Sequence, residues 1–437
     1  VMCRALRVQN SKLRLRTPAL SGGGFGIKVA VFPYIVLMSI AARITGKPVK
    51  WVEDRLEHLA AATAAPNRIV NLQAAAMNDG RVTGFRYHQT DDYGAYLRAP
   101  MPGPLVRMHG VMTGAYDVKN LYIHNQLVMT NKCPSGMVRG FGGPQMYYAL
   151  ERVMHRIAIE LDLDPLEVIR KNLVPSGAFP YHCAAGAILD SGDYPKAVEI
   201  AEKDGRLDEL KRRRDKARAE GRIYGIGYAA VIEPTQSNMG YITTMLTKEE
   251  RDGKDPTSGA TSMATINVDP FGGVSVTSDT TPQGQGHATI FSQIVADELG
   301  LEPGDITCNL EIDTQKDAWS IAAGSYSCRF SAGPAVAAQI AAKQVRDKLS
   351  RIAAQNLNVP VEQVEFAERK VFARNNPDNA ISFNRVAGVA HWSPRRLPDG
   401  MDAGINETGV WSPPELTPPD SEDRINTSLT YGFNFDF

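Results

Sequence analysis

The chain reads SGGGFGIK at residues 21–28, a glycine-rich loop, and two later stretches are glycine-rich loops as well. Residues 139–145 read RGFGGPQ, and residues 283–287 read QGQGH. Each glycine-rich loop precedes a segment with helix-like apolar spacing. Glycine lets the backbone approach a ligand closely, and the start of a helix presents unpaired N–H groups and a partial positive charge. Three such loops, spread over more than half of the chain, predict one elongated ligand that carries phosphate.

One glycine-rich loop alone is a weak signal, because a tight turn between core elements gives the same pattern. The first loop also lacks the last glycine of the dinucleotide fingerprint, since Ile27 and Lys28 stand in its place. A nicotinamide-dependent dehydrogenase is therefore disfavoured. Polar side chains beside the loops favour ligand binding, because glutamine amides suit the edges of a heterocycle and arginine suits phosphate. These side chains are Arg139, Gln145, Gln283, Gln285 and His287.

Length and composition indicate a soluble protein with more than one domain. A chain of 437 residues is too long for a single hydrophobic core. The 48 basic residues balance the 48 acidic ones, so no net charge favours nucleic acid or an anionic membrane. The five cysteines have no metal-ligand spacing, which predicts that this chain carries no iron–sulfur cluster or zinc knuckle of its own. The longest apolar run, residues 29–42, contains Pro33 and is too short to span a bilayer.

Hairpin and helix patterns alternate along the chain and predict an α+β fold rather than a doubly wound parallel sheet. Residues 69–74 and 82–87 alternate around an Asn-Asp-Gly turn, which indicates a β-hairpin. Helices are expected after each loop, and one charged helix over residues 197–222. Proline and glycine punctuation predicts domains at residues 1–178 and 179–437, the second ending in an extended, poorly packed proline-rich tail. A short strand is expected over residues 48–52.

The loops, with a fourth one at residues 324–329 (GSYSCR), resemble the cofactor loops of one enzyme family. This family is the molybdenum-binding large subunit of the xanthine dehydrogenase and aldehyde oxidase group. Further matches occur in the family's order and cover nearly the whole chain. They are residues 53–58 (EDRLEH), 92–96 (DYGAY), 164–167 (DPLE) and 191–194 (SGDY). The resemblance implies two molybdopterin-binding domains of mixed sheets and helices, incomplete at both ends relative to the family.

The resemblance implies a molybdenum–molybdopterin cytosine dinucleotide as cofactor, whose diphosphate accounts for the repeated anion sites. No protein side chain needs to be a metal ligand, because the pterin binds the molybdenum. The protein positions and tunes the cofactor instead. The implied cofactor-binding residues are Gly24, Phe25, Gly26, Arg139, Gly140, Gln283, Gly284, Gln285, Gly286, His287, Thr289, Gly324, Ser325 and Ser327.

Three residues are implied to contact the substrate: Phe141, Val29 and Arg107. Phe141 is suited to stack on an aromatic ring. Val29 stands where purine-oxidising members carry a glutamate, and Gly140 stands where carbon monoxide dehydrogenases carry a cysteine, so both substrates are disfavoured. Arg107 aligns loosely with a substrate-orienting arginine, and a surface arginine is the alternative.

The family's catalytic base, a glutamate in a Gly-x-Gly-Glu stretch, has no match here, because Glu407 and Glu415 lie in other contexts. No catalytic residue is therefore assigned within this chain. The resemblance also implies that the sequence is a fragment or one part of a split subunit.

The leading hypothesis is the cofactor-binding part of a molybdenum hydroxylase, active only with partner chains. Such enzymes oxidise an aromatic N-heterocycle or an aldehyde with oxygen derived from water and pass a hydride to Mo=S. Expected partners are an iron–sulfur subunit carrying [2Fe-2S], a flavin subunit carrying FAD, and a second chain that completes the molybdenum subunit. A cytoplasmic location is expected, with the periplasm as alternative through a co-exported partner. The alternative function is a non-catalytic assembly subunit that retains the fold.

Overall fold

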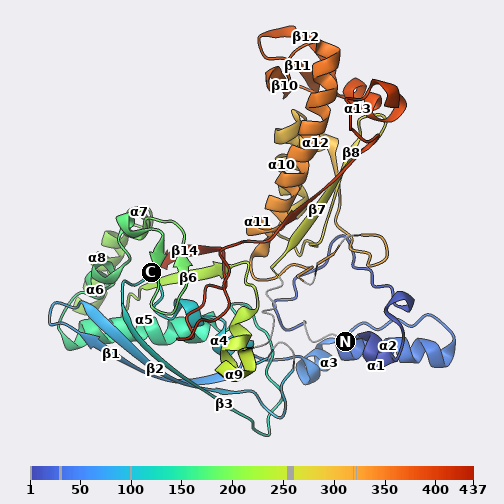
Figure 1. The fold of residues 1–437 in the computed structure, drawn as a ribbon. Coiled ribbons are helices and arrows are strands. Elements are labelled where there is room, and N and C mark those ends of the chain that lie inside the picture. Colours follow the sequence, from blue (N-terminus) through green and yellow to red (C-terminus); the bar gives the residue numbers. More distant parts are fainter. Residues whose placement is uncertain (1, 29–31, 99–100, 253–259, 318, 321) are drawn as a thin grey trace. The chain divides into compact units, whose positions relative to one another are not determined.

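The computed structural model describes residues 2–28, 32–98, 101–252, 260–317, 319–320 and 322–437. The chain forms two compact units, each assembled from separate segments. Unit 1 comprises Val1–Arg7, Gly24–Ser258 and Glu415–Phe437, and unit 2 comprises Val8–Gly23 and Gly259–Pro414. Both units mix helices and strands (Figure 1), which confirms the predicted α+β class. The division between residues 178 and 179 stays a prediction.

The first sheet of unit 1 contains the predicted hairpin. β1 (Asn67–Ala76) pairs antiparallel with β2 (Val82–Asp92), and β3 (Asn120–Val128) lies parallel to β2. Alternate residues of β2, among them Phe85 and Tyr87, are buried in the core that α5 (Gly143–Glu160) also forms. Leu150 and Met154 of α5 are fully buried there. The apolar period of two in the strand and of 3.6 in the helix thus builds one core.

A second, two-stranded sheet has one edge closed by side chains. β6 (Ala229–Thr235) pairs antiparallel with β14 (Thr430–Asp436). On the other edge of β6, Ala230 N donates to Glu151 Oε2 at 3.0 Å, and Ile232 N donates to Tyr147 Oη at 3.1 Å. Because buried backbone N–H groups need acceptors, these α5 side chains stabilise the strand. Burial raises the pKa of the Glu151 carboxyl to about 7.

The predicted charged helix over residues 197–222 forms two helices, α7 (Tyr194–Asp204) and α8 (Leu207–Ala219). The break lies at Gly205 and Arg206, and Arg206 has a left-handed φ of 53°. A Cβ at position 205 would lie 2.4 Å from the Phe437 ring, so close packing requires glycine there. Single-sequence periodicity does not reveal this contact, because Phe437 is distant in the chain.

The remaining elements of unit 1 are short, except for α2. The predicted strand over residues 48–52 is wrong, since these residues form no strand. The helix predicted after the first glycine-rich loop is described from Phe32 onward. The elements are α1 (Met2–Leu6), α2 (Phe32–Thr45), α3 (Arg55–Ala61), α4 (Gly103–Val106), α6 (Pro165–Asn172), β4 (Tyr181–His182), β5 (Ile188–Leu189) and α9 (Lys248–Arg251).

Unit 2 has a four-stranded sheet with the order β13-β7-β8-β9. β7 (Ser262–Val268) pairs antiparallel with β13 (Ile405–Trp411) and with β8 (Val274–Ser278). β9 (Ile306–Asn309) is parallel to β8 and follows the crossover helix α10 (His287–Leu299). A helical crossover is the usual connection between parallel neighbours. The third glycine-rich loop therefore lies at the end of β8, where α10 begins.

The long helix α12 (Pro334–Leu357) follows the short α11 (Arg329–Ala332) and packs against α10, β7 and β13 (Figure 1). Buried alanines of α12, such as Ala337 and Ala341, let β13 approach the helix closely. A Cβ at Gly409 of β13 would lie only 2.0 Å from the Ala337 carbonyl oxygen. A small sheet and the last helix complete unit 2: β10 (Val364–Ala367), β11 (Lys370–Ala373), β12 (Asn376–Ser382) and α13 (Phe383–Trp392).

The proline-rich tail is better packed than its composition predicts. Ile425 and Asn426 are almost fully buried. Asn426 Nδ2 donates to the Glu415 carbonyl oxygen at 3.0 Å, and Ile425 N donates to the Ala185 carbonyl oxygen at 2.9 Å. Residues 414–424 are mostly exposed and form no helix or strand, so the expectation of a poorly packed tail is wrong only for residues 425–428, which are buried and held by specific hydrogen bonds. Among the described residues, no helix combines the length and apolarity needed to cross a membrane.

Candidate functional site

In unit 1 the first two glycine-rich loops lie against each other. Arg139 N donates to the Phe25 carbonyl oxygen at 2.9 Å. Gly26 has a φ of +89°, and a Cβ there would lie 2.9 Å from the Met137 carbonyl carbon. The Phe25 side chain is 60% exposed, and the Arg139 guanidinium carbon lies 6.0 Å from its ring centroid. The predicted cofactor residues of these two loops are therefore brought together, although they are more than 100 positions apart.

The second loop has three successive residues with left-handed backbone. Gly140, Phe141 and Gly142 have φ values of 92°, 39° and 96°. Left-handed backbone is costly for phenylalanine, so the surroundings must hold it. A Cβ at Gly142 would lie 2.0 Å from the Pro104 carbonyl oxygen, and one at Gly103 would lie 2.5 Å from the Phe141 ring. These close approaches fix the loop on α4.

The Phe141 ring also meets Tyr241 edge to face, with ring centroids 6.4 Å apart. It packs on a small core formed by Tyr93, Leu105, Val106 and Tyr241. Tyr93 Oη donates to Asp91 and to the Pro102 carbonyl oxygen, each within about 3 Å. The predicted substrate-stacking ring is thus held on several sides by described residues.

Arg107 is not a surface arginine, because only 4% of it is exposed. Its Nη1 donates to the Gly140 carbonyl oxygen at 2.9 Å. Its Nη2 donates to Glu233 Oε1 at 2.9 Å and to the Pro234 carbonyl oxygen at 3.2 Å. Arg107 therefore joins the second loop to β6. The third predicted substrate residue, Val29, lies outside the described residues.

In unit 2 the third and fourth loops share hydrogen bonds. Gln285 Oε1 accepts from Gln283 N, and Gln285 Nε2 donates to Ser325 Oγ at 3.1 Å. Ser21, which starts the first loop, donates from its backbone N to the Pro282 carbonyl oxygen at 3.2 Å. Unit 2 thus brings together the predicted residues Gln283, Gln285 and Ser325.

Three glycines of these loops leave open space at the surface of unit 2. Gly284, Gly286 and Gly324 have φ values of +108°, +77° and +119°, and a Cβ at each would meet nothing within 4 Å. Gly286 caps the start of α10, a helix of 13 residues. Thr289 in its first turn is exposed. Open glycine backbone beside a helix N-terminus is suited to a phosphate or another anion.

Buried polar groups lie beneath the two loops. His287 is 1% exposed and stacks on Phe330, with ring centroids 4.0 Å apart and planes 6° apart. Burial and, to a lesser extent, the nearby Arg329 charge lower the pKa of the imidazole, so the neutral form is favoured. His287 Nδ1 has no hydrogen-bond partner within the part of the chain that the structure describes. Such an orphaned polar atom is suited to a polar ligand group.

Asp279 and Arg329 support the fourth loop, and the sequence prediction missed both. Asp279 O accepts from Gly324 N at 2.8 Å, and Arg329 Nη1 donates to Gly324 O at 3.0 Å. Asp279 Oδ2 accepts from Ser320 Oγ at 2.8 Å and from Arg329 Nη2 at 3.4 Å. Both side chains are almost fully buried. The signal available in the sequence was the position of Asp279 directly after a strand and of Arg329 as the last residue of the loop. Ser327 in this loop has a left-handed φ of 52°.

The glutamates that fail to match the catalytic motif have other surroundings. Glu407 lies in β13, and its carboxylate pairs with Lys348 at 3.2 Å. The Glu415 carbonyl oxygen accepts the Asn426 side chain. Over the residues that the structure describes, no three His, Cys, Asp or Glu side chains gather as a metal site.

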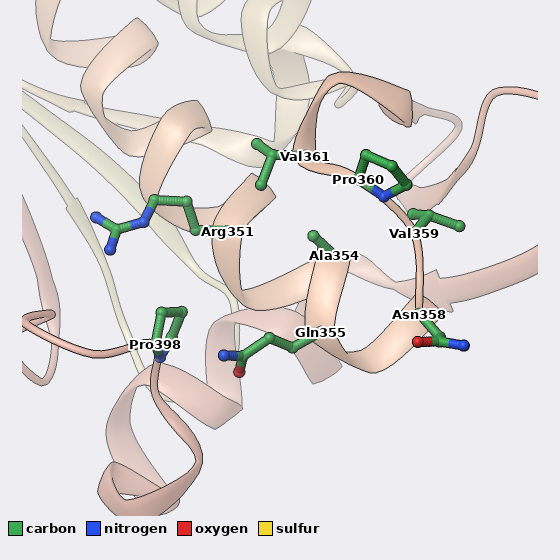
Figure 2. A pocket seen from close by; sticks show the side chains of 8 residues that line it. All are labelled: Arg351, Ala354, Gln355, Asn358, Val359, Pro360, Val361 and Pro398. Atoms are coloured by element: carbon green, nitrogen blue, oxygen red, sulfur yellow. The ribbon is translucent and has the colours of Figure 1, made fainter.

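Figure 2 shows a shallow hollow of about 520 Å³ in unit 2, none of whose lining residues belongs to the loops. Arg351 and Gln355 line it from the C-terminal half of α12, together with Pro360 and Pro398. The fourth loop precedes the other end of this helix, which has 24 residues and is therefore about 36 Å long. The hollow is not part of the loop site.

Comparisons with known proteins match both halves of the chain. Residues 1–173 and residues 200–436 each match a family described as "Molybdopterin cofactor-binding domain". The nicotine 6-hydroxylase large subunit of Paenarthrobacter nicotinovorans is 30% identical over 90% of this chain and 47% of its own length. The carbon monoxide dehydrogenase large chain of Hydrogenophaga pseudoflava is 28% identical over 94% of this chain and 50% of its own.

Solved structures give the same result. Quinoline 2-oxidoreductase from Pseudomonas putida 86 superposes with a TM-score of 0.83 at 28% identity, over 94% of this chain and 51% of that one. Carbon monoxide dehydrogenase from Oligotropha carboxidovorans superposes with a TM-score of 0.82 at 28% identity, over 98% and 50%. The chain thus spans about half the length of these relatives. Because the two family matches cover most of it, the chain belongs to the molybdopterin-binding large subunits of the carbon monoxide dehydrogenase and xanthine dehydrogenase family of molybdenum hydroxylases.

Proposed function

We propose that this chain is the cofactor-binding part of a molybdenum hydroxylase that oxidises an aromatic N-heterocycle or an aldehyde. The observation that carries the proposal is the open glycine surface of unit 2. Gly284, Gly286 and Gly324 adopt left-handed backbone without any described side chain filling the space before them. Such conformations are retained where a ligand must approach the backbone. His287 Nδ1 adds a buried polar atom that lacks a partner among the described residues.

The residues present fit a pterin dinucleotide. In unit 2, backbone N–H groups at Gly284 and Gly286 would hold phosphate, with Ser325 and Ser327 as hydroxyl donors. In unit 1, Phe25 and Arg139 would lie beside the metal end, because their loops are already fixed to each other. When bound, the molybdenum pterin supplies two-electron oxidation with oxygen from water. We propose the cytosine dinucleotide form.

For the substrate we propose an aromatic ring stacked on Phe141. The ring of Phe141 is held by Gly103 and Tyr241, and a fixed aromatic face binds a flat substrate at low entropic cost. Gly140 in place of a cysteine argues against carbon monoxide as substrate, and Val29 in place of a glutamate argues against a purine. The relatives named for nicotine and quinoline are consistent with an N-heterocycle.

We propose partner subunits that carry [2Fe-2S] clusters and FAD, in the cytoplasm or, with a co-exported partner, the periplasm.

We also propose a partner polypeptide that covers the surface of α2 and α3. Leu37, Ile44, Val52, Leu56 and Leu59 are each more than half exposed within about 25 residues. Apolar clusters of this kind mark protein interfaces. This partner corresponds to the other half of the large subunit, on the same chain or a separate one.

The alternative is a non-catalytic assembly subunit that keeps the fold. The observation in its favour is that no described glutamate stands in the Gly-x-Gly-Glu context of the catalytic base. Native mass spectrometry of the complex purified from its source would give the subunit masses and the bound pterin. Oxidation of quinoline or benzaldehyde with an artificial electron acceptor would then be measured. Pterin without any turnover by the complex would favour the assembly role, and turnover would exclude it.

A further inference from the structure

A charge pair between the buried Arg107 and the partly exposed Glu233 joins the second glycine-rich loop to β6. The Arg107 guanidinium contacts three backbone or side-chain oxygens, those of Gly140, Glu233 and Pro234, at 2.9 to 3.2 Å. Its side chain is 4% exposed, whereas that of Glu233 is 34% exposed. A guanidinium presents its donors in a fixed planar fork, so it sets the relative position of the groups it binds.

The second loop needs such support. Gly140, Phe141 and Gly142 are all left-handed, and this conformation is unfavourable for Phe141. The Gly140 carbonyl oxygen accepts both Arg107 Nη1 and, at 2.8 Å, the backbone N of Gly143. It is the point at which the turn closes. Arg107 therefore holds the turn that orients the Phe141 ring.

A substrate-contacting role for Arg107 fits this geometry poorly. One of its terminal nitrogens is bound to the Gly140 carbonyl, and the other is bound to Glu233 and Pro234. Both hydrogens of Nη2 are used by Glu233 and Pro234, and the second hydrogen of Nη1 faces Met108 Sδ at 3.8 Å. A substrate that binds Nη2 would therefore displace one of its two acceptors, which is costly for a buried guanidinium.

We propose that Arg107 and Glu233 are positioning residues that lock the second loop and so fix the orientation of Phe141, rather than contacting the substrate. The contacts of Arg107 with Gly140, Glu233 and Pro234 are called the clamp below. Its role in catalysis rests on the proposed function, in which Phe141 stacks on the substrate. The clamp itself is a property of unit 1, and its test does not require a bound pterin.

The test follows the loop directly in the purified protein. Incorporation of 4-fluorophenylalanine in place of Phe141 gives a ¹⁹F NMR signal, and hydrogen–deuterium exchange reports the amide protons of residues 138–143. We expect a single ¹⁹F line in the parent protein. In Arg107→Met the line splits or broadens, and the loop amides exchange about tenfold faster, because charge-assisted hydrogen bonds are lost.

Conservative variants separate positioning from general destabilisation. Arg107→Lys keeps one donor and rescues the exchange rate in part, because an ammonium group cannot reproduce the fork. Glu233→Gln keeps an acceptor and causes a smaller change. The matched control is Arg346→Met. Arg346 also donates to a backbone carbonyl, that of Glu298, and pairs with Glu365, but it lies in unit 2. We expect Arg346→Met to leave the ¹⁹F line of the labelled Phe141 unchanged.

A ¹⁹F line and exchange rates that are unchanged in Arg107→Met would overturn the clamp. An equal effect of Arg346→Met would overturn it as well. Pterin content is measured on the same samples, so a failure of the proposed function is recognised separately: the parent protein would then contain no pterin, while the loop response to Arg107→Met would persist.

Discussion

Replacing Gly286 by alanine tests whether the open glycine surface of unit 2, formed by Gly284, Gly286 and Gly324, is a cofactor-binding site. Gly286 has a φ of +77° and caps the start of α10, and a Cβ there meets nothing within 4 Å. In the protein alone the substitution therefore costs only the left-handed conformation, about 1–2 kcal/mol. If a phosphate group lies in that space, the methyl group displaces it as well.

The matched control is Gly400→Ala. Gly400 also belongs to unit 2, has a φ of +71°, and has nothing within 4 Å of its Cβ position. The two variants should lose similar stability, about 1–2 kcal/mol in the free energy of unfolding. Only Gly286→Ala should lose cofactor. One charge-assisted hydrogen bond to phosphate contributes about 1.5–3 kcal/mol, so the affinity should fall about ten- to hundredfold.

The assay combines urea unfolding with fluorescence of the oxidised pterin released on denaturation. Equal pterin content in Gly286→Ala and Gly400→Ala, at equal stability, would refute the assignment of this surface to the cofactor. A much larger stability loss in Gly286→Ala would instead show that its surroundings are packed, against the open geometry.

Three further predictions concern the fold that carries the loops. Burial raises the pKa of Glu151 from its usual range to about 7. Its contribution to stability is therefore fully present below about pH 4.5 and is lost as pH rises through 7, a decline of about 3 kcal/mol at most in the free energy of unfolding. Glu151→Gln should flatten this decline in urea unfolding measured between about pH 5 and 8. Gly409→Ala should lower the free energy of unfolding by about 2 kcal/mol, because the new methyl group meets the Ala337 carbonyl oxygen, and an unchanged value would contradict the close approach. Arg14 hydrogen-bonds Asp313 and lowers the pKa of that carboxyl to about 2. The stabilisation by this pair is therefore present above about pH 4 and is lost as pH falls through 2. Arg14→Met should lower the free energy of unfolding at about pH 7, and its difference from the parent protein should be smaller at about pH 3.

Local patterns predicted the main elements well. The hairpin of β1 and β2, the helices after the loops and the α+β class follow from apolar period and turn chemistry, which act over a few residues. Contacts between distant positions were not predictable in this way. The close approach of Phe437 to Gly205, which lies between α7 and α8, and the burial of Ile425 in the tail are examples.

The candidate site shows the same limit. The glycine-rich loops were visible in the sequence, since glycine, glutamine and arginine are needed in the loops themselves. Their supports were not: Asp279, Arg329 and Glu233 are ordinary charged residues until the fold brings them beneath a loop. Arg107 was recognised, but its burial and its pairing with Glu233 depend on the tertiary structure.

The most direct test of the central claim is metal and pterin analysis of the native protein. Molybdenum is measured by mass spectrometry of the purified complex, and the pterin is released, oxidised and identified with its attached nucleotide. The account predicts molybdenum and pterin in equal, stoichiometric amounts with the chain, and cytidine monophosphate on hydrolysis of the dinucleotide. Substoichiometric molybdenum with no released pterin in the freshly purified complex would contradict it.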